Sequence, residues 1–307
     1  MSGRPDHHAR TARSAGPPVA GSAAAFLWLA PWLTGFAVFL LAPAAMSAYY
    51  AMTDYSLLEP PVWIGAANFA ELWHDPLFWK ACRNTVYYAT VSVTLGAVLS
   101  LCVAALLEMH VRGRGIARAI IFLPTLVPLV AAALAWSLMY NPEAGLMNRA
   151  LATIGLPKIN WLGEARWAMP ALIIMGLWNI GTAVVIYSAA LRDVPRALYE
   201  AAEIDGVSRL GRLWHVSIPC ISPAILFNVM ISIIWSLQVF GAPQIMTEGG
   251  PDHATYVYQL SVYEHAFRYG RMGYASAMAW LQLLATLGIA ALTLALSRRF
   301  VHHRGAA

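Results

Sequence analysis

The sequence predicts an all-α membrane protein with six transmembrane helices. Hydrophobic residues make up 59% of the 307 residues and charged residues only 11%, whereas roughly 25% of residues in ordinary soluble domains are charged. Six windows without Asp, Glu, Lys or Arg exceed the about 20 residues that a helix needs to cross the hydrocarbon core. Because lipid cannot satisfy open backbone groups, each window is expected to be helical.

In chain order, these windows are Ser14–Thr53, Asn84–Leu107, Ala119–Pro142, Trp167–Leu191, Leu213–Thr247 and Met272–Ser297. The first and fifth are longer than one span needs, so part of each is expected outside the membrane. The transmembrane domain then occupies residues 21–300, with spans at about 25–50, 85–108, 118–140, 168–190, 222–245 and 273–297. Pro124 and Pro128 interrupt the helical hydrogen bonds of the third span and favour a kink there.

The two ends of the chain are predicted to be tails. Residues 1–20 are rich in Pro, Gly, Ser and Arg, a composition typical of disorder, and residues 301–307 form a short polar end. Arg4 to Arg13 resemble the basic start of a signal peptide, and Ala42-Pro43-Ala44 resembles a cleavage site. The apolar run between them is too long for a signal peptide, so we expect it to remain as the first span.

The distribution of basic residues predicts that both termini are cytoplasmic. With that orientation, thirteen of the 20 Lys and Arg residues lie inside, and seven lie outside. The inner residues are Arg4, Arg10, Arg13, Arg112, Arg114, Arg118, Arg192, Arg196, Arg209, Arg212, Arg298, Arg299 and Arg304; the outer ones are Lys80, Arg83, Arg149, Lys158, Arg166, Arg268 and Arg271. The formal net charge of +5 therefore reflects membrane topology rather than nucleic-acid binding.

The loop at 192–219, between the fourth and fifth spans, is polar yet predicted to be helical. Pro195 suits the first turn of a helix, and Arg196 to Ile204 are mostly good helix formers. Gly206 can end that helix in a left-handed conformation. Ser208 can cap a second short helix that ends near Ile218-Pro219.

One face of the first loop helix is small, because Leu198, Ala201, Ala202 and Asp205 recur at spacings of three and four. A polar helix between two membrane spans, on the predicted cytoplasmic side, indicates that another protein docks there. The small side chains would let that protein approach closely.

The loop resembles the EAA motif of binding-protein-dependent ABC transporter permeases. The match consists of Glu200-Ala201-Ala202, Asp205-Gly206, and Ile218-Pro219 followed by Pro223. The resemblance implies that Glu200, Ala201, Ala202, Asp205, Gly206, Ile218 and Pro219 couple the chain to an ATPase.

Further segments extend the resemblance. Asn68-Phe69, Asp75-Pro76, Phe78-Trp79 and Asn84-Thr85 resemble the first external loop of that family. Thr247-x-Gly249-Gly250-Pro251 with Thr255, and Met272-Gly273-Tyr274-Ala275-Ser276-Ala277, resemble the last external loop and final span of its carbohydrate-uptake subgroup, and the Gly-Gly-Pro run is typical of the maltose and glycerol-phosphate type first subunit. The solute implied is a sugar or a glycerol phosphodiester, with polyols left open.

The resemblance also implies the partners and the location. We expect a second homologous permease subunit to form a heterodimer with this chain, a dimer of ABC ATPase subunits beneath the pair, and an extracytoplasmic solute-binding protein. ATP and Mg²⁺ would bind to the ATPase, and this chain would bind no cofactor. The pair would lie in a prokaryotic inner membrane.

The chain itself offers no enzymatic motif. It contains no GxxxxGK[ST] phosphate loop, no HExxH and no GxSxG elbow. The three cysteines, Cys82, Cys102 and Cys220, are kept apart by the predicted topology, so neither a disulfide nor a metal site is expected. No catalytic residue is assigned, and the chain is expected not to be an enzyme.

Uncharged polar and aromatic residues inside the spans are candidates for a solute path. They are Trp178, Asn179, Thr182, Asn228, Ser232, Trp235, Gln238, Ser276 and Trp280. Amides can bind hydroxyl groups as donor and acceptor, and indole rings can stack on a sugar. The alternative is that these groups hydrogen-bond the helices to one another.

Two other classes of function stay open at this point. An ion-coupled secondary transporter needs an ionisable group inside a span, and such groups are almost absent here. A membrane scaffold or polytopic enzyme without transport would leave the Glu200 helix without a partner. The sequence favours a permease subunit of an ATP-driven importer over both.

Overall fold

The computed structural model describes residues 22–109 and 113–300. The predicted tails at 1–20 and 301–307 lie outside the described residues. The chain divides into two compact units, Met1–Tyr49 and Tyr50–Ala307, which are described separately. Within the described ranges almost all regular structure is helical, and the strands are the two-residue β1 (Thr53–Asp54) and its antiparallel partner β2 (Val62–Trp63).

The first unit is a continuous apolar helical segment. It consists of α1 (Ser22–Phe36), the π-helical turn η1 (Ala37–Leu41) and α2 (Ala42–Tyr50). Pro43 follows the π turn, and the wider turn relieves the clash that a proline ring makes with the carbonyl four residues earlier. Trp28 is 85% exposed and Phe39 82% exposed. Such a surface suits lipid or another helix, and Leu27–Tyr50 is long enough to cross a membrane.

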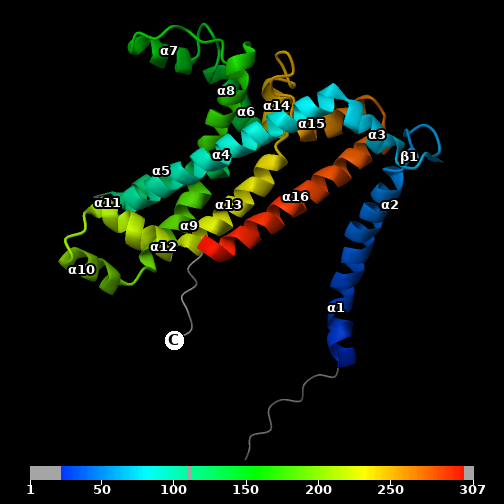
Figure 1. Ribbon diagram of the computed structural model, residues 1–307. Coiled ribbons are helices and arrows are strands. Elements are labelled where there is room, and N and C mark those ends of the chain that lie inside the picture. The colour runs from blue at the N-terminus through cyan, green and yellow to red at the C-terminus, as the bar shows by residue number, and fades with distance from the viewer. Residues whose placement is uncertain (1–21, 110–112, 301–307) are drawn as a thin grey trace, which may run out of the picture. The chain divides into compact units, whose positions relative to one another are not determined.

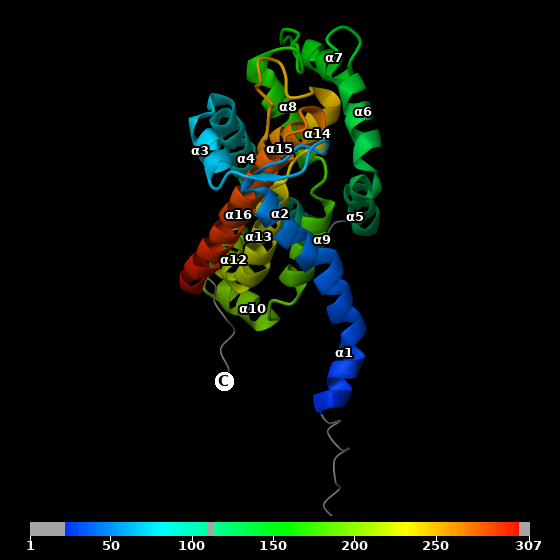
Figure 2. The ribbon, with the colours of Figure 1, turned by 90° about the vertical axis from the view of Figure 1, so that its right-hand side faces the viewer.

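The second unit holds the remaining elements (Figures 1 and 2). They are α3 (Ala67–His74), α4 (Pro76–Glu108), α5 (Arg114–Phe122), the 3₁₀ turn η2 (Leu123–Leu126), α6 (Leu129–Met139), α7 (Leu146–Thr153), α8 (Ala165–Leu177), α9 (Gly181–Arg192), α10 (Arg196–Ile204), α11 (Arg209–Arg212), η3 (Leu213–Ser217), α12 (Ile218–Cys220), α13 (Ser222–Leu237), α14 (Gly241–Met246), α15 (Tyr258–Tyr263), η4 (Glu264–Arg268) and α16 (Met272–Phe300). In both views α10 to α12 lie at the end where α16 finishes, and α7 lies at the opposite end.

Two helices of this unit are long and apolar enough to cross a membrane without a break. α4 begins at Pro76, where Asp75 accepts a hydrogen bond from Leu77 N at 2.8 Å and the proline occupies the first turn. The α16 segment Met272–Ser297 is likewise long and apolar enough to cross. These two and Leu27–Tyr50 correspond to the second, sixth and first windows of the sequence.

The other three windows are bent rather than straight. Arg114–Leu126 and Leu129–Met139 meet at 102°, Ala165–Leu177 and Gly181–Arg192 at 48°, and Arg209–Cys220 and Ser222–Leu237 at 73°. The first bend falls at Val127-Pro128, as the prolines of the third window predict, because the residue before a proline disfavours helix. Counting each bent pair as one span gives up to six spans among the described residues, in agreement with the predicted number.

Glycines let the broken segments pack closely. A Cβ atom added to Gly181, the first residue of α9, would lie 2.6 Å from the Ile121 carbonyl oxygen of α5. A Cβ atom added to Gly241, the first residue of α14, would lie 2.5 Å from the Leu129 side chain at the start of α6. Both helix starts therefore lie close against other broken segments. At Gly181 the neighbour is backbone, which cannot move aside for a larger side chain, whereas at Gly241 the neighbour is a flexible leucine side chain.

Three apolar clusters hold the unit together. One gathers α6, α8 and the α14–α15 region around Trp136, Tyr140 and Leu172. A second joins α3, α4 and α16 around Leu72 and Met278. The third joins α4, α9 and the α10–α13 region, and it includes Tyr187 and Ile221.

A small lobe that contains α7 is organised around the side chain of Asn148, which is 2% exposed. Its Nδ2 donates to the Pro142 and Ile159 carbonyls at 3.0 and 2.9 Å. Its Oδ1 accepts from Ile159 N at 3.1 Å and from Trp161 Nε1 at 3.2 Å. One buried amide therefore closes the lobe on both sides of α7.

We expect Asn148→Leu to destabilise this lobe by at least about 3 kcal/mol, because each buried group left without a partner costs roughly 1–3 kcal/mol. The measurement is limited proteolysis within residues 142–163, together with thermal unfolding in detergent. Arg149→Leu, an exposed neighbour on the same helix, is the control. Equal protease resistance in the two variants would show that the Asn148 network does not hold the lobe.

Candidate functional site

The polar loop between α9 and α13 forms as local sequence chemistry predicts. α10 spans Arg196–Ile204 directly after Pro195, and it ends before Gly206, whose φ is +73°. A glycine adopts this left-handed conformation without the penalty that a Cβ atom brings. Ser208 then caps α11, since its Oγ accepts a hydrogen bond from Gly211 N at 3.2 Å.

The loop is fastened to itself by polar contacts between its two arms. The hydroxyls of Tyr199 on α10 and Ser217 on η3 lie 2.8 Å apart. Arg212 Nη1 donates to Glu203 Oε2 at 3.3 Å. Tyr199 and Val216 also pack against the apolar cluster that joins α4 and α9. The loop is therefore a folded unit seated on the bundle.

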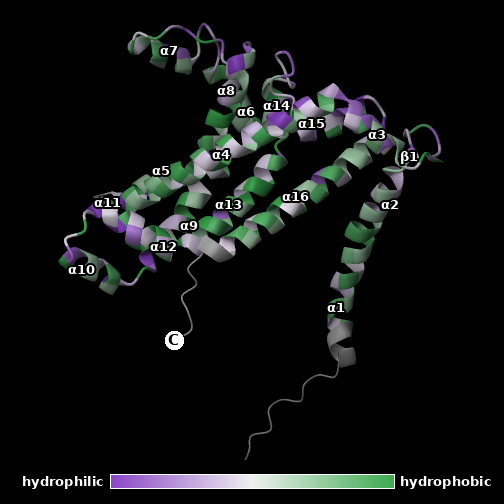
Figure 3. Cartoon of the chain, viewed as in Figure 1, coloured by the Kyte–Doolittle hydropathy of each residue, from purple (hydrophilic) through white to green (hydrophobic). Residues whose placement is uncertain are grey.

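α10 presents an exposed face that is partly apolar. Leu198 is 44% exposed and Ile204 86% exposed, and Glu200, Ala201 and Asp205 are exposed beside them. Figure 3 shows hydrophilic residues gathered around α10 and α11 and hydrophobic residues along α13 and α16. Exposed large apolar side chains on an otherwise polar helix indicate a contact surface for another protein.

Ala202 differs from the expectation for this face. It is only 8% exposed, because α10 turns this side toward the loop, and its carbonyl accepts a hydrogen bond from Val207 N at 2.9 Å. Ala202 therefore serves packing within the loop, while Ala201 remains on the outer surface. The pattern of small residues did not reveal which alanine faces inward.

Ile218 and Pro219 lie in α12, where the loop joins the membrane bundle. Both are half-buried, and the following bend into α13 is 73°. Cys220 and Ile221 of the same junction pack on the cluster shared with α4 and α9. These residues connect the loop to α13 rather than adding to the exposed face of α10.

Three of the candidate solute-path residues lie at or beside the break between α8 and α9. Trp178 and Asn179 lie in the non-helical connection, and Thr182 lies in the first turn of α9; all three are exposed. Trp178 packs edge-on to Trp136 of α6, with ring centroids 6.0 Å apart. The structure thus brings them together at a place where both spans are interrupted.

The candidates on the fifth span fall into different environments. Asn228 is 7% exposed, and its Nδ2 donates at 3.2 Å to the Ala224 carbonyl, four residues earlier in the same helix. Ser232 is half-buried. Trp235 is 72% exposed, and Gln238, just beyond the end of α13, is also exposed. The expected span at 222–245 contains α13, a break, and then α14.

The remaining candidates, Ser276 and Trp280, are half-buried on α16, and Trp280 packs against the cluster around Met278. Nearby, Gln282 Nε2 donates to the Leu237 carbonyl at 2.8 Å. This bond satisfies a backbone group at the end of α13 that would otherwise be open.

Residues of the family-like sequence segments hydrogen-bond neighbouring parts of the chain at the end of the bundle that carries α3. Asn68 Nδ2 donates to the Ala51 and Thr53 carbonyls at 3.0 and 2.9 Å. Asp75 accepts from the Tyr274 hydroxyl at 2.9 Å. These hydrogen bonds give Asn68 and Asp75 a structural role that requires no solute.

The loop that carries Gly249-Gly250-Pro251 is fastened to the start of α4. Asn84 Nδ2 donates to the His253 and Tyr256 carbonyls at 2.8 and 2.9 Å. Thr85 Oγ1 accepts from Tyr258 N at 2.8 Å. At the same end, Arg271 donates to Glu71 at 2.6 Å, and this hydrogen bond raises the pKa of Arg271.

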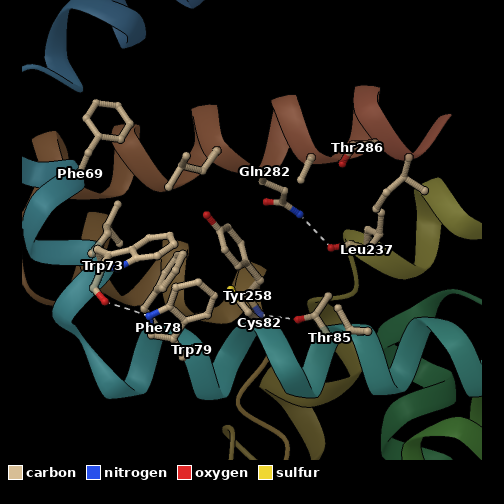
Figure 4. A pocket seen from close by; sticks show the side chains of 15 residues that line it. Phe69, Trp73, Phe78, Trp79, Cys82, Thr85, Leu237, Tyr258, Gln282 and Thr286 are labelled. Carbon is tan, nitrogen blue, oxygen red and sulfur yellow. Dashed lines mark hydrogen bonds between the residues drawn. The ribbon is translucent and has the colours of Figure 1, made fainter. Parts of the chain in front are cut away.

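A groove of about 420 Å³ lies between α3, α4 and α16. Figure 4 shows aromatic side chains, among them Trp73, Trp79 and Tyr258, around it, with Gln282 and Thr286 farther along. Its lining is almost entirely apolar, and none of the candidate solute-path residues lines it. This groove therefore does not coincide with the path predicted from the sequence.

Residues 92–302 match the family described as binding-protein-dependent transport system inner membrane component. The chain belongs to this family. The match covers the loop with Glu200 and Gly206, and it confirms the resemblance drawn from the EAA residues as well as the all-α membrane fold.

Curated relatives of this family cover most of the chain. The lactose transport system permease protein LacF of Rhizobium radiobacter is 35% identical over 251 residues, which are 80% of this chain and 83% of that protein. The diacetylchitobiose uptake system permease protein NgcF of Streptomyces coelicolor is 34% identical over 278 residues, 86% of this chain and 79% of that protein. The chain is thus a permease subunit of an ABC importer and not an enzyme, as the sequence predicts.

A solved structure of the same fold covers 90% of this chain and 94% of its own, with a TM-score of 0.80 and 25% identity. It is a bacterial alginate ABC transporter in complex with an alginate pentasaccharide-bound periplasmic protein. The agreement extends over both continuous and bent spans of the permease fold.

We expect Tyr199→Phe to loosen α10 by about 1 kcal/mol, the net contribution of one hydrogen bond. The measurement is hydrogen exchange of the α10 amides, which should speed up roughly fivefold for that change in opening free energy. Tyr87→Phe, at an exposed tyrosine of α4, should leave the exchange of α10 unchanged. Unaltered exchange in Tyr199→Phe would mean that the contact with Ser217 does not hold the loop.

Proposed function

We propose that this chain is one of two homologous membrane subunits of an ATP-driven importer for a sugar or a closely related polar solute. A dimer of ABC ATPase subunits, with ATP and Mg²⁺, drives the pair, and an extracytoplasmic binding protein delivers the solute. The observation that supports the proposal most strongly is the exposed face of α10, with Leu198, Glu200, Ala201 and Ile204. No single-chain role explains an apolar, motif-bearing surface on a polar loop.

In the proposed mechanism, α10 seats in a cleft of one ATPase subunit. Glu200 pairs with a basic group in that cleft, Ala201 permits close approach, and Gly206 allows the sharp turn after the helix. When ATP closes the ATPase dimer, α10 moves with its subunit. Residues Ile218 and Pro219 pass this motion to α13, and Arg192 passes it to α9.

The proposed solute path lies at the breaks of the bent spans. Irregular backbone at membrane depth is tolerated where it is buried in protein or lines a water-filled cavity, and interrupted helices form the binding sites of many transporters. Trp178 and Asn179 lie at the break between α8 and α9, Gln238 lies where α13 ends before α14, and all three are exposed, with Thr182 and Trp235 nearby. Indole rings and amides without charge suit a hydroxyl-rich, neutral solute.

Ser232, Ser276 and Trp280 are assigned a secondary place in this path, because they are half-buried rather than exposed. Asn228, which is 7% exposed and whose Nδ2 bonds the Ala224 carbonyl of its own helix, is given the same secondary place. The sugar class is supported by relatives named for lactose and diacetylchitobiose and by the alginate transporter of similar fold.

The proposed location is a prokaryotic inner membrane with both termini and the α10 loop in the cytoplasm. The excess of basic residues on that side supports this orientation. It places α10 where ATP is available and the α7 lobe outside.

The proposal predicts that Glu200→Ala and Gly206→Val lower recovery of the ATPase with the permease and abolish uptake. In Gly206→Val the positive φ is strained for a branched side chain, although nothing lies within 4 Å of an added Cβ atom. Copurification from membranes and uptake by whole cells are the measurements. Glu143→Ala, an exposed carboxylate of the α7 lobe, should retain both. Normal copurification and uptake in the two loop variants would refute the coupling role.

The orientation is tested by the access of a membrane-impermeant thiol reagent to single cysteines. In intact cells we expect labelling of Glu143→Cys and none of Asp205→Cys, because only the α7 lobe faces outward in the proposed topology. Permeabilised cells should label both. If Asp205→Cys reacts in intact cells, α10 is outside and no ATPase can reach it.

A further inference from the structure

The carboxylate of Glu108, the last residue of α4, lies among the guanidinium groups of three arginines. Arg114 Nη1 donates to Oε2 at 3.2 Å, and Arg118 Nη2 donates to Oε1 at 3.1 Å. Arg192 makes the closest set: Nε lies 3.1 Å from both carboxylate oxygens, and Nη2 lies 3.0 Å from Oε1. We call Glu108 and these three arginines the Glu108 cluster.

The cluster is shielded from solvent at its centre. The Glu108 side chain is 16% exposed, whereas those of Arg114 and Arg192 are 41% and 45% exposed. Isolated ion pairs on a surface contribute little, but several charges in one network with a multiply bonded guanidinium contribute more. The Glu108 carboxylate, which is mostly shielded from solvent, therefore holds the ends of neighbouring helices in a defined arrangement.

The three arginines differ in what they connect. Arg114 and Arg118 belong to α5, which follows α4 in the sequence, so their bonds close the α4–α5 hairpin. Arg192 is the last residue of α9, 84 residues from Glu108 and four residues before α10 begins. Of the three arginines, Arg192 is the one that ties the base of the α10 loop to α4.

Apolar packing also connects the loop to α4. Tyr199, Val216 and Ile221 pack in one cluster with Ala104 and Leu107 of α4. Apolar contact is non-directional, so it does not by itself select one orientation of the loop. The hydrogen bonds from one guanidinium to a shielded carboxylate instead fix direction and distance.

We propose that Glu108 is a positioning residue for coupling, and that its bonds to Arg192 lock the α10 loop and α4 into one rigid body. Motion of α10 then reaches α4 and α5 together with α9 and α13. The inference rests on the proposed function, because it assigns a path to the motion that the ATPase would impose. It adds an ion cluster, separate from the exposed face of α10, to the residues that transmit motion from the ATPase to the membrane helices.

Arg192→Gln and Arg114→Gln form a matched pair for the test. Each removes one guanidinium from the same carboxylate, and each leaves Glu108 with two arginines. Only the first breaks the tie to the α10 loop. Glu108→Gln is a less suitable variant, because it leaves three neighbouring cations without their counter-charge and can prevent folding.

The test measures the distance between α4 and the loop in the full complex with the ATPase and the second permease, reconstituted in liposomes. Spin labels are placed on the native, exposed Cys102 of α4 and on Arg209→Cys, an exposed position of α11. Cys82 and Cys220 are replaced by serine. Pulsed electron paramagnetic resonance gives the distance distribution without nucleotide and in the vanadate-trapped state.

With the Glu108 cluster intact, the distribution should be narrow and unchanged between the two states. Arg192→Gln should broaden it and shift it on vanadate trapping, while Arg114→Gln should behave like the parent chain. Arg192→Lys, which keeps the charge but loses the planar fork, should give an intermediate width.

The inference is overturned if Arg192→Gln stays as narrow as the parent, if Arg114→Gln broadens equally, or if the parent distance itself changes on trapping. Copurification of the ATPase is recorded for every variant. Failure of the parent chain to bind an ATPase would refute the proposed function, whereas normal binding with an unchanged Arg192→Gln distribution would refute only the role of the cluster.

Discussion

The structure depends on one constraint, which is that hydrocarbon offers no hydrogen bonds to the backbone. α4 and α16 meet it as unbroken helices. The bent spans meet it differently: α9 starts at Gly181, pressed against the backbone of α5, and the Leu237 carbonyl at the end of α13 accepts from Gln282. Neighbouring segments therefore cover some of the backbone groups that the broken helices leave open.

This constraint links the loop to the proposed path. A span that is interrupted at its middle can bend there without breaking further hydrogen bonds, while the half next to the loop stays a rigid helix. α9 runs from its break directly to Arg192, and α13 runs from the loop to its break after Leu237. Both helices that flank α10 therefore join the exposed loop at one end and a break at the other, which is the arrangement needed to convert displacement of the loop into a change at the breaks.

Features set by neighbouring residues in the sequence were predictable. The left-handed Gly206, the Ser208 cap and the bend at Val127-Pro128 each follow from one or two residues. The break at Trp178–Ile180 has no proline and depends on the approach of α5 to Gly181, which only the packed chain defines. The inward direction of Ala202 escaped prediction for the same reason, since helical spacing groups residues by face but does not say which face is covered.

The Glu108 cluster shows most clearly what sequence alone hides. Arg114 and Arg118 are four residues apart and near Glu108 in the chain, but Arg192 joins them across 84 residues. In the sequence Glu108, Arg118 and Arg192 merely bound charge-free windows, and the arginines count only toward membrane orientation. Folding brings them to one carboxylate because α4 and α9 finish, and α5 begins, beside one another, and charge is confined to the ends of spans. The rule that confines charge to the ends of spans thus also brings together residues that can link those ends to one another. Hydrogen bonds between these residues fix a direction and a distance, which apolar packing deeper in the bundle does not.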